Sequence, residues 1–286
     1  MKLHSINTGY FKLDGGAMFG VVPKVMWQKL NPPDDNNLCN WAMRCLLIDT
    51  GARRILVDTG IGDKQDAKFF GHYYLNGHDT LHNSLQQLGY NASDITDVLH
   101  THLHFDHCGG TIVRNGDALQ TAFPNATLWS NERHWRWATQ PNDREKASFL
   151  KENILPIEAS GKLRFVPVAE EGTVPFDDVP GISVRFAFGH TDAMMLPQIK
   201  IGDKTVVYMA DLLPSPAHIP LPYVMAYDMF PLITLQEKKR FLEEAVDNNY
   251  ILYFEHDPSV ECCTLVRTEK GIRADKTGTL QAMLSV

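Results

Sequence analysis

The sequence lacks apolar runs long enough to cross a membrane. Runs such as VVYMA at residues 206–210 are short, whereas a membrane-spanning helix needs about 20 consecutive apolar residues. The opening segment, MKLHSINTGYFKLDGG, has no apolar core of the kind found in signal peptides. We therefore expect no membrane association, and a cytoplasmic location is the default expectation.

Cysteine is also scarce. The five cysteines, at positions 39, 45, 108, 262 and 263, are an odd number and include no Cys-x-x-Cys pair. This pattern excludes a disulfide framework and a thiolate zinc site. A chain of 286 residues can bury roughly three quarters of its unfolded surface, so it needs no disulfides for stability.

Basic residues are fewer than acidic ones. The chain has 27 Lys and Arg against 34 Asp and Glu, which gives a formal net charge of −7. A broad nucleic-acid-binding surface needs clustered basic side chains to neutralise phosphates. No nucleic-acid partner is therefore expected.

Strands and helices are expected to alternate, which is typical of a layered α/β protein. Short runs rich in Leu, Ile and Val predict buried strands at 43–49, 54–58, 95–100, 126–130, 182–188, 195–201, 205–210 and 250–256. Helical spacing predicts helices at 80–89, 131–138, 143–154 and 235–249. Gly202-Asp203-Lys204 predicts a hairpin turn, and the proline-rich stretch 212–233 predicts a functional loop.

Metal-binding side chains are abundant at one place. THLHFDH at 101–107 contains His102, His104, Asp106 and His107. Three further candidates follow the ends of expected strands, namely His190, Asp211 and His256. Loops at strand ends converge on one edge of a sheet, where α/β proteins build their sites. Each of the three alone would be read as a capping residue, but together with the cluster they predict a metal site.

The motif His102-x-His104-x-Asp106-His107, followed by Gly189-His190-Thr191, Ala210-Asp211 and Glu255-His256, resembles the metallo-β-lactamase superfamily. Asp58 of VDTG matches that superfamily's early aspartate. The resemblance spans roughly residues 40–260. It implies an α/β fold, an αββα sandwich of two mixed β-sheets with helices on the outer faces. The whole chain, 1–286, would be one such domain with an N-terminal half of about 1–165 and a C-terminal half of about 166–286.

The resemblance also implies two divalent metal ions. His102, His104 and His190 would hold one ion, Asp106, His107 and His256 would hold the other, and Asp211 would bridge them. Zn²⁺ is the expected metal, and Mn, Fe or Co also suit imidazole and carboxylate ligands. Asp58, Thr101 and Thr191 would orient the ligands.

The family chemistry implied is hydrolysis by a hydroxide held between the metals, with Asp106 delivering a proton to the leaving group. The chain most resembles the quorum-quenching N-acyl-homoserine lactonases and methyl-parathion-hydrolase-like enzymes, so we expect a lactone or ester substrate. Well-known lactonases carry a tyrosine three residues after the bridging aspartate, where this chain has Pro214. Tyr223 or Tyr227 would supply the catalytic phenol instead, unless both simply pack the loop. A homodimer would suit the N-terminal arm.

Several alternatives remain. A phosphotriesterase or broad-specificity esterase would use the same bimetal core. A nuclease of the RNase Z type is disfavoured by the acidic chain, a non-catalytic zinc protein by the full ligand set, and a β-lactamase shares only HxHxDH. The histidines without a motif are expected to be exposed or hydrogen-bonded, namely His72, His78, His82, His134 and His218, with His218 the strongest exception.

Overall fold

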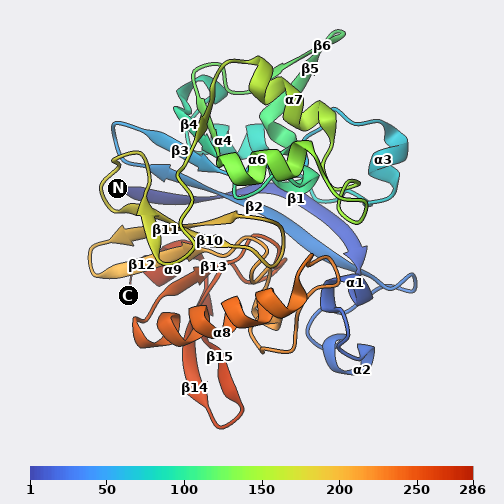
Figure 1. Cartoon of the computed structure of the whole chain (residues 1–286), viewed down its shortest axis with the longest axis vertical. Coiled ribbons are helices and arrows are strands. Elements are labelled where there is room, and N and C mark those ends of the chain that lie inside the picture. The colour runs from blue at the N-terminus through green and yellow to red at the C-terminus, as the bar shows by residue number, and fades with distance from the viewer. Residues whose placement is uncertain (286) are drawn as a thin grey trace. The chain divides into compact units, whose positions relative to one another are not determined.

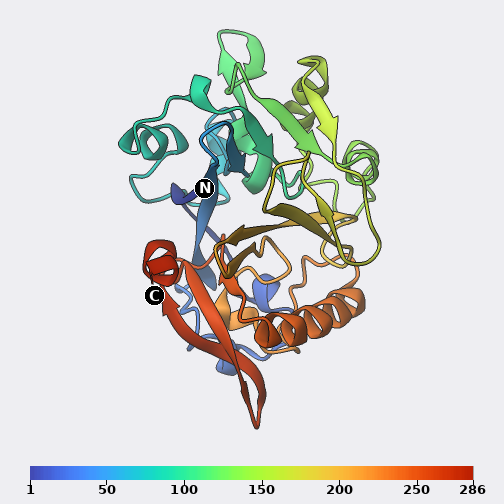
Figure 2. The ribbon, with the colours of Figure 1, turned by 90° about the vertical axis from the view of Figure 1, so that its left-hand side faces the viewer.

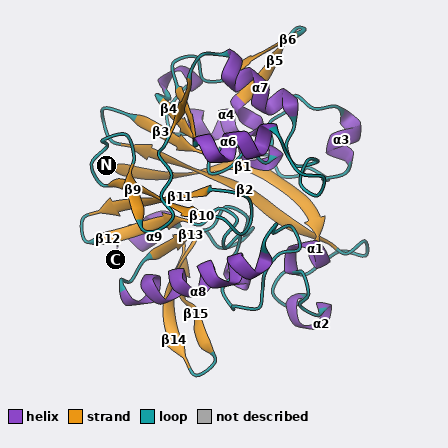
Figure 3. Ribbon diagram, in the orientation of Figure 1, coloured by secondary structure: helices purple, strands orange, loops and turns teal. Residues whose placement is uncertain are grey.

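The computed structural model describes residues 1–285, and Val286, the last residue of the predicted domain, lies outside the described residues. The chain forms two compact units, one of residues 1–9 with 43–170 and one of residues 10–42 with 171–286. Helices and strands alternate along both (Figures 1 and 3). None of the helices within residues 1–285 is long and apolar enough to span a bilayer.

The first large sheet has the strand order β1-β2-β3-β4-β7-β8. Its strands are β1 (Lys2–Asp14), β2 (Leu38–Asp49), β3 (Arg54–Val57), β4 (Asp97–Leu99), β7 (Thr127–Ser130) and β8 (Leu163–Phe165). β2 and β3 are antiparallel, whereas β3, β4, β7 and β8 pair in parallel. The sheet is therefore mixed, and Val57, Leu99 and Trp129 align at one end of three parallel neighbours.

The helices of the first unit are short. They are α3 (Ala67–Gly71), α4 (Leu81–Gln87), α5 (Phe105–Cys108), α6 (Glu132–Thr139) and α7 (Lys151–Ala159), with 3₁₀ turns at Ala92–Asp94 and Gly109–Thr111. Side-chain caps start three of them, since Asp66 Oδ1 accepts from the Phe69 amide, Thr80 Oγ1 accepts from the Asn83 amide and Asn131 Oδ1 accepts from the His134 amide. A two-stranded hairpin of β5 (Ile112–Asn115) and β6 (Ala118–Thr121) completes this unit.

The second large sheet has the order β15-β14-β13-β12-β11-β10-β9. Its strands are β9 (Thr173–Pro175), β10 (Ile182–Ala187), β11 (Met194–Ile201), β12 (Lys204–Tyr208), β13 (Ile251–Tyr253), β14 (Cys262–Thr268) and β15 (Gly271–Gly278). β12 and β13 are parallel and the other pairs antiparallel, so this sheet is also mixed. The predicted α/β class with two mixed sheets is confirmed.

The second unit also contains helices α1 (Gly15–Phe19), α2 (Lys24–Trp27), α8 (Pro231–Asp247) and α9 (Leu280–Ser285), and a 3₁₀ turn at Pro216–His218. α8 packs against β14 and β15, and the β14–β15 hairpin extends past it in both views (Figures 1 and 2). The Gly202-Asp203 turn joins β11 to β12, as predicted, with Ile201 paired to Lys204.

Two sequence predictions are wrong at their boundaries. Residues 143–148 form turns rather than the predicted helix, because Asn142 Oδ1 accepts from the amides of Arg144 and Glu145 and the Glu145 side chain turns inward. α8 begins at Pro231, inside the predicted loop 212–233, because proline is well suited to the first position of a helix.

Candidate metal centre

The candidate ligands lie just beyond the ends of strands. His102 is three residues past Leu99, the last residue of β4, in the first unit. The second unit repeats this spacing three times, placing His190, Asp211 and His256 three residues past β10, β12 and β13. The predicted positions at strand ends are therefore confirmed within each unit.

Asp58 organises the ligand loop of the first unit. Its carboxylate is fully buried, and its Oδ1 accepts from the Thr101 amide at 2.7 Å. Its Oδ2 accepts from Thr101 Oγ1 at 2.7 Å and from His107 Nδ1 at 3.1 Å. Asp58 and Thr101 thus orient the loop, as expected from the sequence.

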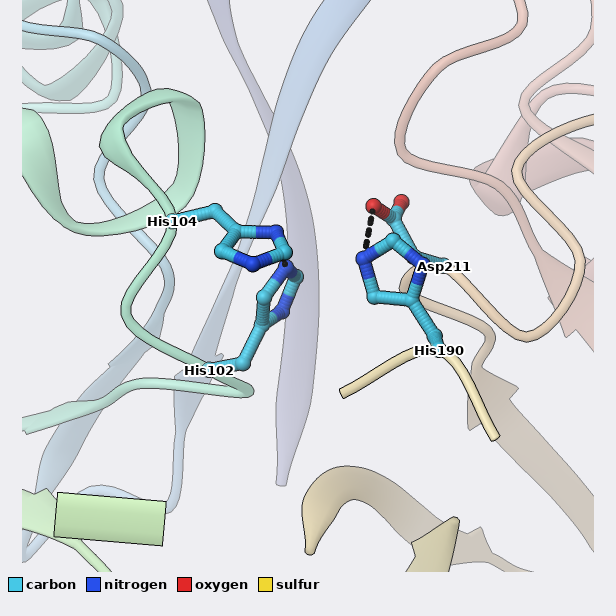
Figure 4. A group of neighbouring side chains, drawn as sticks. All are labelled: His102, His104, His190 and Asp211. Carbon is cyan, nitrogen blue, oxygen red and sulfur yellow. Dashed lines mark hydrogen bonds and ion pairs between the residues drawn. The ribbon is translucent and has the colours of Figure 1, made fainter. Parts of the chain in front are cut away.

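The ring nitrogens of His102 and His104 face each other (Figure 4). Thr101 Oγ1 donates to Asp58, so it accepts from His102 Nδ1 at 3.0 Å. His104 Nε2 donates to the Glu145 carboxylate at 2.9 Å. The remaining nitrogens, His102 Nε2 and His104 Nδ1, are 3.0 Å apart and both present lone pairs. Two lone pairs at this distance repel each other unless a proton or a metal ion lies between them.

Two residues outside the motif hold this loop: Glu145, which the sequence analysis missed, and His134, which it expected only to be exposed or hydrogen-bonded. Glu145 is 1% exposed and binds His104 through Oε1, while its Oε2 accepts from Trp137 Nε1 at 2.6 Å. His134 accepts the Leu103 amide at Nε2, at 2.9 Å. Neither belongs to a sequence motif.

His100 is a buried histidine without a metal-binding role. Its Nδ1 bonds to the Trp129 carbonyl at 2.9 Å, and its Nε2 bonds to Thr111 Oγ1 at 2.7 Å. Burial lowers its pKa, so the ring is neutral. Thr111 continues to Thr59, whose hydroxyl donates to the His107 carbonyl at 3.0 Å. This network fixes the backbone of the last histidine of the motif.

Asp211 lies between two histidines of the second unit. His190 Nε2 is 3.0 Å from Asp211 Oδ2, the pair marked in Figure 4, and His256 Nε2 is 3.0 Å from Asp211 Oδ1. The other nitrogens are donors, from His190 Nδ1 to Asp228 Oδ1 at 2.8 Å and from His256 Nδ1 to the Ala42 carbonyl at 2.8 Å. Each carboxylate oxygen therefore faces the Nε2 atom of one imidazole, an arrangement suited to a bridging carboxylate.

The electrostatics of His190 favour positive charge at this position. Burial lowers its pKa, but the carboxylates of Asp211 and Asp228 outweigh burial and raise the pKa to about 10. A histidine between two buried carboxylates either takes a proton or shares a metal ion with them.

The residues present fit a divalent metal. In each of the five candidate histidines one ring nitrogen is fixed by a hydroxyl, carboxylate or carbonyl, and the other is left for a ligand bond; these are His102, His104, His107, His190 and His256. Metal-binding histidines characteristically have such a partner on the second nitrogen. These buried groups of His and Asp side chains indicate a divalent metal site.

His218 is hydrogen-bonded like His134, and so it is not the exception that the sequence suggested. It is 1% exposed, its Nδ1 bonds to Ser215 Oγ at 2.8 Å, and its Nε2 donates to the Met18 carbonyl at 2.9 Å. Its ring stacks on Phe19 with centroids 4.6 Å apart. Burial lowers its pKa to about 3, so His218 is neutral and ties the loop to α1.

The two predicted catalytic tyrosines lie in the loop of the second unit. The Tyr223 ring lies edge-on to Phe19, with centroids 6.2 Å apart. Tyr227 is 37% exposed and precedes Asp228, the partner of His190. Thr191 has a buried hydroxyl without a hydrogen-bond partner within residues 1–285, so its role in orienting a ligand stays a prediction.

A tyrosine of the first unit was missed altogether. Tyr73 packs on Phe105 of the motif, with centroids 4.7 Å apart, and on Phe69 at 5.0 Å. Burial and the Asp106 carboxylate raise its pKa to about 12, so the phenol keeps its proton. Nothing in the local sequence distinguishes Tyr73 from its neighbour Tyr74, which is 53% exposed.

Comparison with known proteins relates this geometry to a family. Residues 44–256 match the model of the metallo-beta-lactamase superfamily. A probable metal-dependent hydrolase from Staphylococcus aureus, whose structure is solved, is 30% identical with a TM-score of 0.86, covering 96% of this chain and 95% of that one. An N-acyl homoserine lactonase from Bacillus thuringiensis is 25% identical over 269 residues, which are 90% of this chain and 93% of the relative. The solved structure of AidC, a dizinc quorum-quenching lactonase in complex with a product, is 21% identical with a TM-score of 0.78 and covers 97% of this chain and 95% of that one. At this identity the likeness shows only that the fold is shared.

Proposed function

The chain belongs to the metallo-beta-lactamase superfamily and is a metal-dependent hydrolase, and from that premise we propose that its buried ligands hold two divalent ions, most simply Zn²⁺. One ion would be held by His102, His104 and His190, the other by Asp106, His107 and His256, with Asp211 shared by both. The observation that supports this proposal is the 3.0 Å approach of His102 Nε2 to His104 Nδ1, in two rings whose other nitrogens are bound to Thr101 and Glu145.

The ions, when bound, supply Lewis acidity and a hydroxide nucleophile at neutral pH. The residues of the chain fix where the reaction takes place. Asp58 keeps His107 Nδ1 protonated by accepting from it at 3.1 Å, and Asp228 does the same for His190 at 2.8 Å. Both histidines therefore present Nε2 to the site. Asp106 is 8% exposed, and its carboxylate would carry a proton to the leaving oxygen of the substrate.

We propose that the substrate is a lactone, opened by hydrolysis, as in quorum quenching. The curated relative from Bacillus thuringiensis is an N-acyl homoserine lactonase, and AidC binds a product of that reaction. The aromatic side chains of Phe69, Tyr73 and Phe105 offer an apolar wall beside Asp106 for an acyl chain. Tyr223 or Tyr227 would donate a hydrogen bond to the lactone.

The test is a direct comparison of substrates. Zinc-loaded protein would be assayed by pH-stat with short- and long-chain acyl-homoserine lactones, and the same sample with a phosphotriester and a simple ester. We expect lactone turnover to dominate and to be lost in Asp211→Asn, while Asp203→Asn in the exposed β11–β12 turn remains active. Pro214 stands where the lactonases have a tyrosine, so the choice of substrate needs this test. Dominant phosphotriester or ester cleavage would reject the lactonase assignment and leave that of a hydrolase with two metal ions.

A further inference from the structure

Two oppositely charged residues are buried side by side in the sequence of α8. Glu237 is 8% exposed and Lys238 is fully buried, although most of the helix's charged residues face solvent. Burying a charge is costly unless it is hydrogen-bonded. Each of the two side chains reaches a different segment of the second unit, and both segments lead to His190.

Glu237 holds the strand end that carries His190. Its Oε1 accepts from the Phe188 amide at 2.7 Å, and its Oε2 accepts from the Gly189 amide at 3.1 Å. Both amides come just after β10 and just before His190. The approach is close, because a Cβ on Gly189 would lie 2.3 Å from the backbone nitrogen of Thr234 in α8.

Lys238 holds the loop that leads to the partner of His190. Its ammonium donates to the Tyr223 carbonyl at 2.7 Å, to the Pro220 carbonyl at 3.2 Å and to the Leu221 carbonyl at 3.4 Å. The loop continues to Asp228, whose Oδ1 accepts from His190 Nδ1 at 2.8 Å. Three carbonyls around one buried ammonium fix a segment whose own backbone makes only turn hydrogen bonds, from the Tyr223 amide to the Pro220 carbonyl and from the Val224 amide to the Pro222 carbonyl.

We propose that Glu237 and Lys238 are positioning residues for the metal ligand His190. Glu237 sets the position of its backbone through the preceding amides, and Lys238 sets the position of the loop that carries its hydrogen-bond partner Asp228. α8 thus brings a ligand and its orienting carboxylate to one place, although they are 38 residues apart in sequence. This proposal rests on the proposed role of His190 as a metal ligand.

The variants Glu237→Gln and Lys238→Met test it. Glutamine keeps the shape but turns an NH₂ group toward one of the two amides, and methionine keeps the apolar stem without donors. Zinc affinity would be measured by competition with a chromophoric chelator, and folding by circular dichroism. We expect each variant to lose about tenfold in affinity for one of the two ions, the low end for groups that orient ligands. Lys239→Met, which removes an exposed charge from the next position, should bind zinc like the wild type.

Folded variants with unchanged zinc affinity would overturn the proposal. If either variant fails to fold, hydrogen exchange on the wild-type protein decides. The amides of Phe188 and Gly189 should exchange as slowly as those inside β10, and exchange as fast as in the exposed turn at 202–203 would overturn the proposal equally. If the wild type binds no zinc while these two amides are protected, the proposed function is rejected, but the contacts of Glu237 with the two amides still stand.

Discussion

The five candidate histidines differ in the ring nitrogen that they leave for a metal. His104 donates from Nε2 to Glu145 and leaves Nδ1, whereas the other four donate from Nδ1 and leave Nε2. The tautomer of His104 therefore depends on a carboxylate that is 41 residues further along the chain. This makes Glu145 a sensitive position for metal binding.

Replacing Glu145 with Gln should weaken metal binding without creating a cavity in the core. The amide keeps the volume, but its NH₂ group competes with its oxygen for His104 and Trp137 and removes a negative charge from the imidazole. Loss of such a partner typically costs about 10–100-fold in metal affinity, and we expect a loss in that range in chelator competition. Glu132→Gln, at an exposed residue of α6 paired with Arg136, is the matched control. Equal zinc affinity in the two variants would contradict the role assigned to Glu145.

His218 should make the protein acid-sensitive. Its pKa is about 3 in the folded protein against an ordinary value of 6.5, so between these values the unfolded chain binds a proton that the folded chain does not. Stability is therefore fully present above pH 6.5 and falls as the pH drops toward 3, by up to about 1.4 kcal/mol per pH unit.

The variant His218→Gln separates this contribution from other titrations. Urea unfolding at pH 7, 6 and 5 should give a wild-type free energy of unfolding that falls more steeply with acid than that of the variant. His82→Gln, at an exposed position of α4, should follow the wild type. Parallel pH dependences for wild type and His218→Gln would show that the ring does not titrate in this way.

The site residues that could be predicted from the sequence are those that belong to a recognisable motif. The ligand cluster of residues 101–107 and Asp58 were found because residue type and spacing carry the chemistry of metal binding. Glu145, Asp228, Glu237 and Lys238 were not found, because each acts through a backbone or ring that is distant in sequence. A single charged residue in a helical pattern is read as exposed, and only the folded chain shows that Lys238 has turned inward.

The strands also divide into those that the sequence predicted and those that it missed. β2, β3, β11 and β12 were predicted because they bury runs rich in apolar residues. β10 was predicted from apolar residues that alternate with Ser183 and Arg185. The hairpin of β14 and β15 was missed, because β15 has no buried residue and reads as a polar segment. β1 was missed as well, since its buried positions at Leu3, Ile6 and Phe11 do not alternate regularly.

The contact between α5 and the turn after β3 leads to a prediction at this scale. A Cβ added to Gly109 would lie 2.1 Å from the carbonyl oxygen of Ile61, an atom of the backbone that cannot rotate away. Gly109→Ala must therefore move α5 or the turn, and such overpacking costs about 1–3 kcal/mol. Urea unfolding should show this loss. Gly71→Ala in α3, where a Cβ meets nothing within 4 Å, should be neutral or slightly stabilising, and equal stability of the two variants would contradict the expected clash.

At the scale of the whole molecule, the proposed ligands come from both compact units. Residues 102–107 belong to one unit, and His190, Asp211 and His256 belong to the other. If the two sets serve the same two ions, as proposed, the units share their metals and the chain 1–286 acts as one domain. If each set instead held an ion of its own, the units would bind metal independently.

Counting metals in single and double variants distinguishes these arrangements. In the proposed assignment His104 and His190 hold the same ion, so His104→Ala and His190→Ala should each reduce bound zinc from two ions per chain to about one. The double variant should then also retain about one ion, because removing two ligands of one site is not additive. Atomic absorption after dialysis measures the stoichiometry, with His82→Ala as the exposed control. A double variant that retains no zinc would mean that the two histidines serve different ions, and the assignment of the ligands would have to be redrawn.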